Sequence, residues 1–203
     1  MDSALPVTGS RQRVPASERR EALIEAAVHE FAEGGLHGTP VDRIARRVGV
    51  AQPYVFSLFG SKKELFLATV QRGFELVAET FSGAAAGFDP SIAVEDADVL
   101  VAMGRSYVEL LHSHRNYLML QHQAYAACDD AEIRDRVRAL YARLVRHVER
   151  VAADSSQRHG QPEPTSERID EFFRYGMWLN VAAAMGVEDL SVGCEWVLAE
   201  GDE

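Results

Sequence analysis

Residues 39–64 constrain the fold of this chain more than any other stretch, because they combine capping residues, helical spacing and a turn. Thr39 and Asp42, with Pro40 between them, are typical of a helix N-terminus: a side-chain cap, a first-turn proline and an acid that bonds back to the cap. Gly49 stands about two turns later, where a left-handed residue ends a helix most easily. The stretch therefore predicts two short helices joined by a tight turn.

Further helices are predicted on both sides of this pair. Ser61 and Glu64 form another capping box, and the apolar series 65–81 follows at helical spacing, so a long helix begins there. Upstream, the apolar residues of 23–31 repeat at three and four positions until Gly34 and Gly35 end the pattern. The upstream helix and the short pair together predict a small three-helix domain.

The second short helix suits the major groove of DNA. Its predicted outer face holds Gln52, Tyr54 and Ser57, while Val55 and Phe59 point inward. The phenol of Tyr54 could reach a phosphate oxygen or pack on a thymine methyl group. Basic residues lie beside this helix: Arg43, Arg46, Arg47, Lys62 and Lys63. The alternative for this basic cluster is a solvated helix face.

A resemblance to a known family rests on these same residues. Thr39, Val41, Ile44, Ala45, Gly49-Val50, Gln52-Pro53 and Phe59-Gly60-Ser61-Lys62-Lys63-Glu64-Leu65 resemble the amino-terminal DNA-binding domain of TetR-family regulators. The similarity covers about residues 17–66, and a run with phenylalanine, glycine, methionine and asparagine near the C-terminus also resembles the family. The resemblance implies a homodimeric, mostly repressing transcription factor that an effector releases from DNA.

The resemblance and the outer face together predict a set of DNA-contacting residues. They are Thr39, Arg47, Gln52, Pro53, Tyr54, Ser57, Lys62 and Lys63. Two positions depart from the family. Family members often have an aromatic or histidine donor at the position of Leu58 and commonly a tyrosine at that of Phe56, so neither can donate from a hydroxyl or imidazole here.

The charge of the chain is unevenly distributed. A net charge of −10 would by itself argue against a nucleic-acid partner. Residues 1–75, however, hold 10 Lys and Arg against 9 Asp and Glu, whereas residues 76–203 hold 11 against 22. The acidic half can therefore face away from double-stranded operator DNA.

The helical pattern continues to the end of the chain and predicts an all-α protein of about nine helices. We expect a flexible arm over residues 1–16, a helix-turn-helix DNA-binding domain over 17–61, and a larger helical domain for effector binding and dimerisation over 62–203. No apolar run approaches the roughly 18 residues of a membrane span, which predicts a cytoplasmic protein without a membrane partner. Cys128 and Cys194 are too few for a metal clip or disulfide framework.

The helix predicted for residues 165–186 is apolar on more than one face. One face can pack inside its own subunit while the other, with the last helix at about 188–200, meets a second copy, which predicts a homodimer through the last two helices. The alternative is a core helix buried in a monomer. A dimer would present two reading helices to successive grooves, so the operator should be a near-palindrome.

Aromatic, flexible and hydrogen-bonding residues on the later helices suggest a pocket for a small apolar or aromatic effector. They are Met103, Tyr107, Tyr117, Gln121, Tyr125, Tyr141, Phe172 and Trp178. The pattern cannot separate a pocket from an ordinary filled core.

Enzyme signatures are weak. Glu109 and His112 have the Glu-x-x-His spacing of di-iron bundles, but no second such pair exists in the sequence. There is no nucleophile elbow, phosphate loop or dinucleotide motif. We therefore expect neither catalytic residues, nor a metal, nor a cofactor. The alternative function is a helical small-molecule-binding or interaction protein that does not bind DNA.

Overall fold

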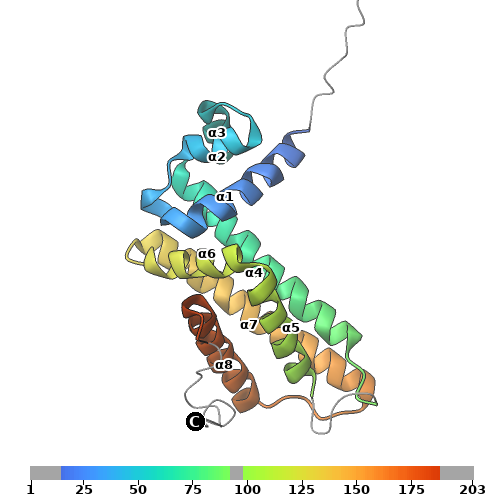
Figure 1. Ribbon diagram of the computed structural model, residues 1–203. Coiled ribbons are helices and arrows are strands. Elements are labelled where there is room, and N and C mark those ends of the chain that lie inside the picture. Colours follow the sequence, from blue (N-terminus) through green and yellow to red (C-terminus); the bar gives the residue numbers. More distant parts are fainter. Residues whose placement is uncertain (1–14, 92–97, 188–203) are drawn as a thin grey trace, which may run out of the picture.

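The structure is a computed structural model that describes residues 15–91 and 98–187 (Figure 1). Within these residues it contains eight helices and no strand. The helices are α1 (Ala16–Gly38), α2 (Val41–Val48), α3 (Gln52–Phe59), α4 (Lys62–Gly87), α5 (Val99–Ser113), α6 (Arg115–Ala126), α7 (Ala131–His159) and α8 (Ser166–Met185). The all-α prediction is confirmed, and the helix predicted at about 188–200 lies outside the described residues.

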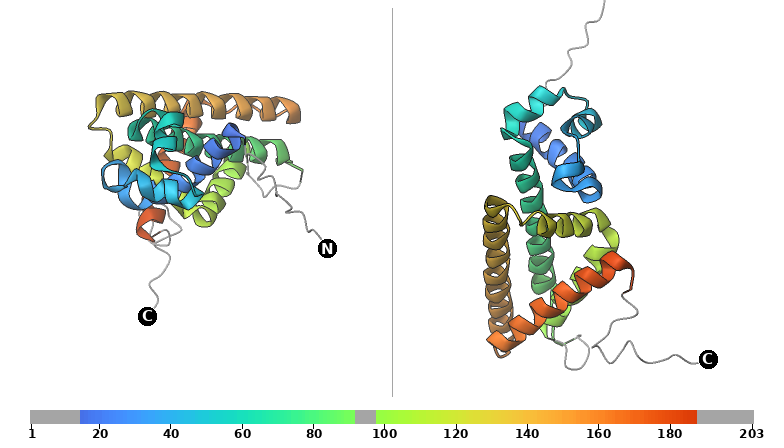
Figure 2. Two further views of the ribbon diagram at one scale, coloured as in Figure 1. Left: turned by 90° about the horizontal axis from the view of Figure 1, so that it is seen from above. Right: turned by 90° about the vertical axis from the view of Figure 1, so that its left-hand side faces the viewer.

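The helices form a small and a larger group that share α4 (Figure 1). Helices α1, α2 and α3 surround the beginning of α4, which then runs on between α5 and α7. Helix α6 lies across the junction and packs on α1, and α8 crosses the open side of the larger group (Figure 2). The two groups are thus joined by one continuous helix and by one transverse helix.

The core of the small group extends into α4. Phe31 of α1 meets Phe66 of α4 edge to face, with ring centroids 5.1 Å apart, and both side chains are fully buried. Leu65 is also fully buried. The first turns of α4 therefore complete the small domain, whose boundary was expected at residue 61.

The cap predicted at the start of α2 is wrong. Helix α2 begins after Pro40 without a side-chain cap, because the buried Thr39 hydroxyl donates instead to the carbonyl oxygen of Glu30 at 2.9 Å. Helix α7, by contrast, begins with a side-chain cap at Asp130. The carboxylate of Asp130 accepts from the backbone N–H groups of Glu132 and Ile133.

Helix α1 extends beyond Gly34 and Gly35, where it was expected to end. Gly35 has a φ of 61° and a non-helical ψ, so it introduces a kink, and another helical turn continues to Gly38. The positive φ favours glycine at this position, and a Cβ atom there would meet the end of the Gln123 side chain of α6. The kink lies where the small group rests on α6.

Candidate DNA-binding surface and interior cavity

A left-handed glycine sets the angle between α2 and α3. Gly49 has a φ of 70°, its N–H donates to Arg46 O at 3.1 Å, and the N–H of Val50 donates to Ala45 O at 3.0 Å. These bonds satisfy the last carbonyls of α2 and turn the chain sharply. Helix α3 then packs inward through Val55 and Phe59, as the sequence predicted.

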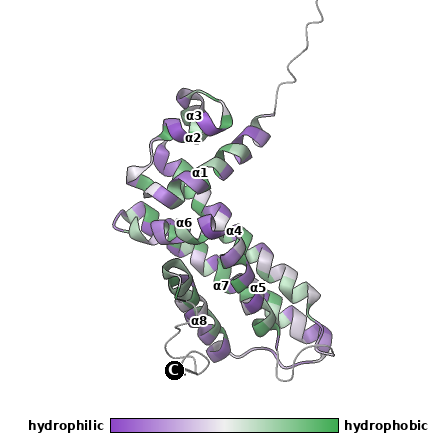
Figure 3. Cartoon of the chain, in the orientation of Figure 1, coloured by the Kyte–Doolittle hydropathy of each residue, from purple (hydrophilic) through white to green (hydrophobic). Residues whose placement is uncertain are grey.

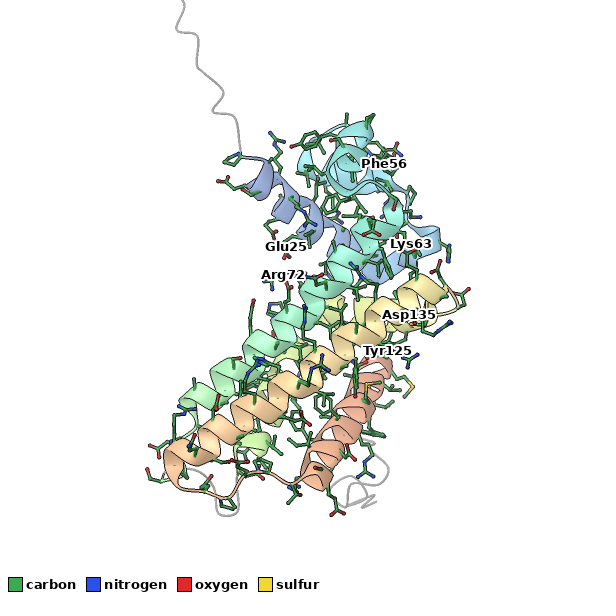
Figure 4. The ribbon with its side chains drawn as sticks, turned by 180° about the vertical axis from the view of Figure 1, so that it is seen from behind. Glu25, Phe56, Lys63, Arg72, Tyr125 and Asp135 are labelled. Carbon is green, nitrogen blue, oxygen red and sulfur yellow. The ribbon has the colours of Figure 1, made fainter. Side chains whose placement is uncertain are left out.

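The outward face of α3 is displaced from the predicted one. Gln52, Pro53, Phe56 and Ser57 are exposed, whereas Tyr54 is half-buried and packs against the core. The helical repeat explains this, because Tyr54 lies two positions and hence about 200° around the axis from Gln52. The exposed ring of Phe56, at the far end of the small domain (Figure 4), is a surface residue that the sequence analysis treated only as a lost hydroxyl.

A buried carboxylate holds the arginines of α2. Glu30 is only 3% exposed, and it pairs with Arg43 Nε at 2.9 Å and with Arg47 Nε. Arg47 also contacts the ring of His29. Arg46 pairs with Asp42 on its own helix. The predicted contact residues Thr39 and Arg47 are therefore both tied to Glu30, which the sequence analysis did not single out.

The two adjacent lysines at the start of α4 have different surroundings. Lys62 Nζ donates to the carbonyl oxygen of His37 at 3.2 Å, and partial burial lowers the pKa of Lys62. Lys63 Nζ bonds to Asp130 at 2.8 Å and Glu132 at 2.9 Å, and these hydrogen bonds raise its pKa. Lys63 thus links α4 to the start of α7 (Figure 4).

The larger group contains a cavity of about 70 Å³ between α4, α5, α6, α7 and α8. Five of the eight predicted pocket residues line it: Tyr107, Tyr117, Gln121, Tyr141 and Phe172. The other three lie outside the lining. Met103 is fully buried in the core, and Trp178 stacks on Tyr175. Tyr125 accepts a hydrogen bond from the lining residue Gln121 without lining the cavity itself.

Three glycines inside helices face this cavity, and the sequence analysis did not connect them with it. They are Gly73 on α4, Gly104 on α5 and Gly176 on α8. A Cβ atom at these positions would lie 3.5 Å from Tyr117, 3.9 Å from Phe172 and 4.0 Å from Tyr107, respectively. Glycine weakens the interior of a helix. Three helical glycines around one cavity therefore indicate that the absence of side chains at these positions keeps the cavity open.

A polar corner interrupts the apolar lining. The fully buried Asn180 of α8 donates through Nδ2 to Tyr107 Oη at 3.0 Å and to Gln121 Oε1 at 2.7 Å. Gln121 in turn donates to Tyr125 Oη. Burial raises the pKa of Tyr107, and it raises that of Tyr125 to about 12. Both phenols are therefore neutral hydrogen-bonding groups at physiological pH.

Helix α8 is most hydrophobic toward its C-terminal end (Figure 3), and part of that end is exposed. Tyr175, Val181 and Met185 are 38%, 45% and 65% exposed. The preceding turns are more polar, and Arg168 pairs there with Asp98 and Glu171. An exposed apolar face on one helix is a feature of protein interfaces.

The described part of the chain contains no group of three or more His, Cys, Asp or Glu side chains suited to hold a metal ion. The Glu109 and His112 pair lies on the exposed side of α5. No helix among the described residues is long and apolar enough to cross a membrane.

A short helix whose exposed face follows a glycine turn, supported by two other helices, defines a helix-turn-helix protein. Residues 23–69 match the family of bacterial regulatory proteins named tetR. Residues 23–69 are therefore similar in sequence to the TetR family, and the chain shares its fold with a TetR-like regulator from Rhodococcus.

Two curated relatives match the N-terminal part of the chain. The transcriptional activator FasR of Mycolicibacterium smegmatis is 44% identical over 69 residues, which are 33% of this chain and 32% of FasR. The transcriptional repressor AcnR of Corynebacterium efficiens is 37% identical over 68 residues, 34% of this chain and 36% of AcnR. The match thus spans about a third of the length of either relative.

The similarity to solved structures extends further along the chain. The regulator FadR of Bacillus subtilis, solved in complex with stearoyl-CoA, is similar with a TM-score of 0.60 and 18% identity. That match covers 84% of this chain and 96% of the FadR chain. At this identity, the likeness shows a shared fold.

Proposed function

We propose that this protein is a homodimeric DNA-binding transcriptional regulator that represses until a small uncharged effector enters the interior cavity and releases it from a palindromic operator. The outward face of α3, in a domain that matches the family model, carries the proposal. In domain terms, residues 17–61 with the first turns of α4 bind DNA, and the remainder of 62–203 binds effector and partner subunit.

The structure suggests different roles for the predicted DNA contacts. Gln52 can make paired hydrogen bonds to an adenine, and Pro53 and Phe56 can pack on thymine methyl groups. Ser57 is exposed, although its hydroxyl now donates to Tyr54 O at 2.7 Å. Lys62 is the phosphate contact that we favour. Lys62 begins α4 three residues after the end of α3, so it and the exposed side chains of α3 could meet a single groove.

Three other predicted contacts have internal partners. The hydroxyl of Thr39 is buried, so this residue would meet a phosphate through its backbone at the start of α2. Arg47 and Lys63 would have to leave Glu30 and the Asp130 and Glu132 pair, respectively. We therefore propose that their main role is to position α2 and α4.

Dimerisation is supported by the outer apolar surface of α8. Tyr175, Val181 and Met185 would be covered by the same helix of a second copy in a two-fold arrangement. Two copies of α3 could then enter successive major grooves roughly 34 Å apart. The dimer would then bind both half-sites of the operator at once, and each half-site would contribute to the free energy of binding.

The effector class follows from the lining of the cavity. No Lys, Arg, Asp or Glu is among the lining residues, and the imidazole of His114 is exposed, so the lining offers no permanent charge to pair with a charged ligand. Gln121 and Tyr107 offer hydrogen bonds to one polar group. A volume of about 70 Å³ accepts only a small molecule without wall movement, far smaller than the stearoyl-CoA bound by FadR. These features favour a small apolar or aromatic molecule with one neutral polar group.

The decisive test is DNA binding by the full chain, measured by fluorescence anisotropy on fragments from upstream of its own gene. We expect sequence-selective binding whose affinity falls steeply with salt. Lys62→Ala should weaken binding on all sequences, and Gln52→Ala should relax preference at particular base pairs. The matched control is Lys63→Ala, for which we expect a much smaller loss than for Lys62→Ala.

Binding without sequence preference or salt dependence would contradict the proposal and favour a helical carrier that does not act on DNA. Sedimentation at micromolar concentration tests the dimer separately. A reporter gene behind the bound fragment tests the sign of regulation, which matters because FasR is named an activator and AcnR a repressor.

A further inference from the structure

One tyrosine spans the distance between the cavity and the DNA-binding domain. Tyr117 of α6 lines the cavity with its ring, opposite Gly73 of α4. Its hydroxyl leaves the cavity and donates to Glu25 Oε1 of α1 at 2.9 Å. Partial burial and then the hydrogen bond to Glu25 raise the pKa of Tyr117, so the phenol remains a donor at neutral pH.

The surroundings of Glu25 make this contact part of the junction between the domains. Arg72 of α4 lies 3.9 Å from the same carboxylate oxygen of Glu25 (Figure 4). Thus α1, α4 and α6 converge on one carboxylate. Elsewhere along the junction, Gln123 of α6 lies against the kink at Gly35. Tyr117 is the member of this set whose side chain also forms cavity wall.

We infer that Tyr117 reports occupancy of the cavity to the DNA-binding domain: a ligand that displaces its ring breaks the bond to Glu25 and loosens α1 from α6. The inference rests on the proposed function, which supplies the ligand and the DNA. It adds the residue that connects them.

The packing around the ring explains why Tyr117 would move. A Cβ atom at Gly73 would lie 3.5 Å from Tyr117 Cδ1, an ordinary contact, so any larger group at this point overlaps the ring. The ring is half-buried, and its hydroxyl end lies at the surface, so it can swing outward without opening the core. Phe81 and Leu120, by contrast, are almost completely buried and are held by several helices.

The free energy of the hydrogen bond between Tyr117 and Glu25 sets the expected change in DNA affinity. A typical net hydrogen bond changes an equilibrium by about fivefold, and this one is partly exposed to solvent. We therefore expect that Tyr117→Phe, which keeps the ring, weakens DNA binding by up to about fivefold. Tyr141→Phe is the control, because Tyr141 lines the same cavity from α7.

A second pair of variants replaces the unknown ligand. Gly73→Val introduces a branched side chain against the Tyr117 ring and should imitate a bound effector. Its control is Gly83→Val on the exposed side of the same helix, where an added Cβ has no neighbour within 4 Å and the change in helix propensity is the same. The double variant Gly73→Val with Tyr117→Phe should lose little affinity beyond Gly73→Val alone, because both disrupt one bond.

Two readouts separate this inference from the proposed function. Hydrogen exchange of the full-length protein requires no DNA, and amides of residues 20–30 should exchange about fivefold faster in Tyr117→Phe, Glu25→Gln and Gly73→Val than in the wild type. Anisotropy then measures DNA affinity for the same proteins. If the wild type binds DNA while Tyr117→Phe and Glu25→Gln leave both exchange and affinity unchanged, the inference is overturned and the function stands.

If the wild type binds no DNA, the proposed function fails, and the exchange measurements still decide whether cavity filling loosens α1. Should Gly73→Val fold poorly, the near-isosteric pair Tyr117→Phe and Glu25→Gln supplies a double-mutant cycle. Full additivity of their effects on exchange would contradict a bond between them.

Discussion

Replacing Gly104 with alanine should stabilise the protein and reduce its response to effector. Alanine is favoured over glycine inside a helix by about 0.8–1.0 kcal/mol. A methyl group at Gly104 would also enter the cavity at an ordinary contact distance from Phe172, 3.9 Å, and burial of such a group contributes about 0.8 kcal/mol. We expect an increase of about 1.5–2 kcal/mol in the free energy of unfolding.

The matched control is Gly83→Ala, an exposed helical glycine on α4 with no neighbour within 4 Å of an added Cβ. It should gain only the propensity contribution of about 0.8–1.0 kcal/mol. Urea unfolding at equal protein concentration measures the difference between the two variants, which isolates the cavity contribution.

Gly104→Ala and Gly83→Ala should also differ in how readily an effector releases them from DNA. An effector that releases the wild type and Gly83→Ala from DNA should act more weakly on Gly104→Ala, because the methyl group occupies ligand space. The reasoning is refuted if Gly104→Ala is less stable than the control, since that would mean the space beside Phe172 is already filled.

Three further predictions concern the buried polar groups. Glu30→Ala should destabilise the DNA-binding domain by about 2 kcal/mol. This loss is below the usual range for a broken buried ion pair, because Arg43 and Arg47 are half-exposed and can be hydrated. An unchanged melting temperature would contradict this prediction. Asn180→Ala removes two buried hydrogen bonds and should cost about 2–3 kcal/mol in urea unfolding, and a cost below about 0.5 kcal/mol would show that the polar corner is not stabilising. The pKa of Tyr125 is raised to about 12, so its contribution to stability is complete below about pH 10 and is lost as pH rises toward 12; Tyr125→Phe should flatten the stability profile in that window, and an identical profile would count against it.

The local features of the small domain were predictable because their causes lie within a few residues. Gly49 ends α2 through its own positive φ, and Ser61 caps α4 by accepting from the N–H of Glu64 at 3.1 Å. The cap expected from Thr39 failed because its hydroxyl found a partner on another helix, the carbonyl of Glu30. Pattern reasoning considers neighbours in sequence and cannot weigh such a competing contact.

The cavity was predictable only in part, for a related reason. Aromatic and amide side chains such as Tyr107 and Gln121 are common in pockets, and these two do line the space. Met103 was predicted to line the pocket as a flexible side chain but fills the core, since a cavity depends on how helices pack and not on residue type. The better signal was the absence of side chains at Gly104 and Gly176 within otherwise regular helices.

The arrangement of α4 bears on how any effector could act. Its first turns belong to the core of the DNA-binding domain through Leu65 and Phe66, and its middle forms cavity wall at Gly73 and Phe81. A regular helix transmits movement as a rigid body, so wall displacement on α4 necessarily tilts the small domain unless the helix bends.

Helix α6 supplies the opposing contact, through Tyr117 on Glu25 and Gln123 at Gly35. Movement of α4 relative to α6 is therefore opposed chiefly where the two helices both meet α1. A ligand can drive that movement only by the difference between its affinities for the two arrangements. Weakening the α6 contact lowers the difference in affinity that the ligand must supply, so Tyr117→Phe should tighten effector binding. The factor by which it tightens effector binding and the factor by which it weakens DNA binding should multiply to roughly fivefold, because both come from one hydrogen bond.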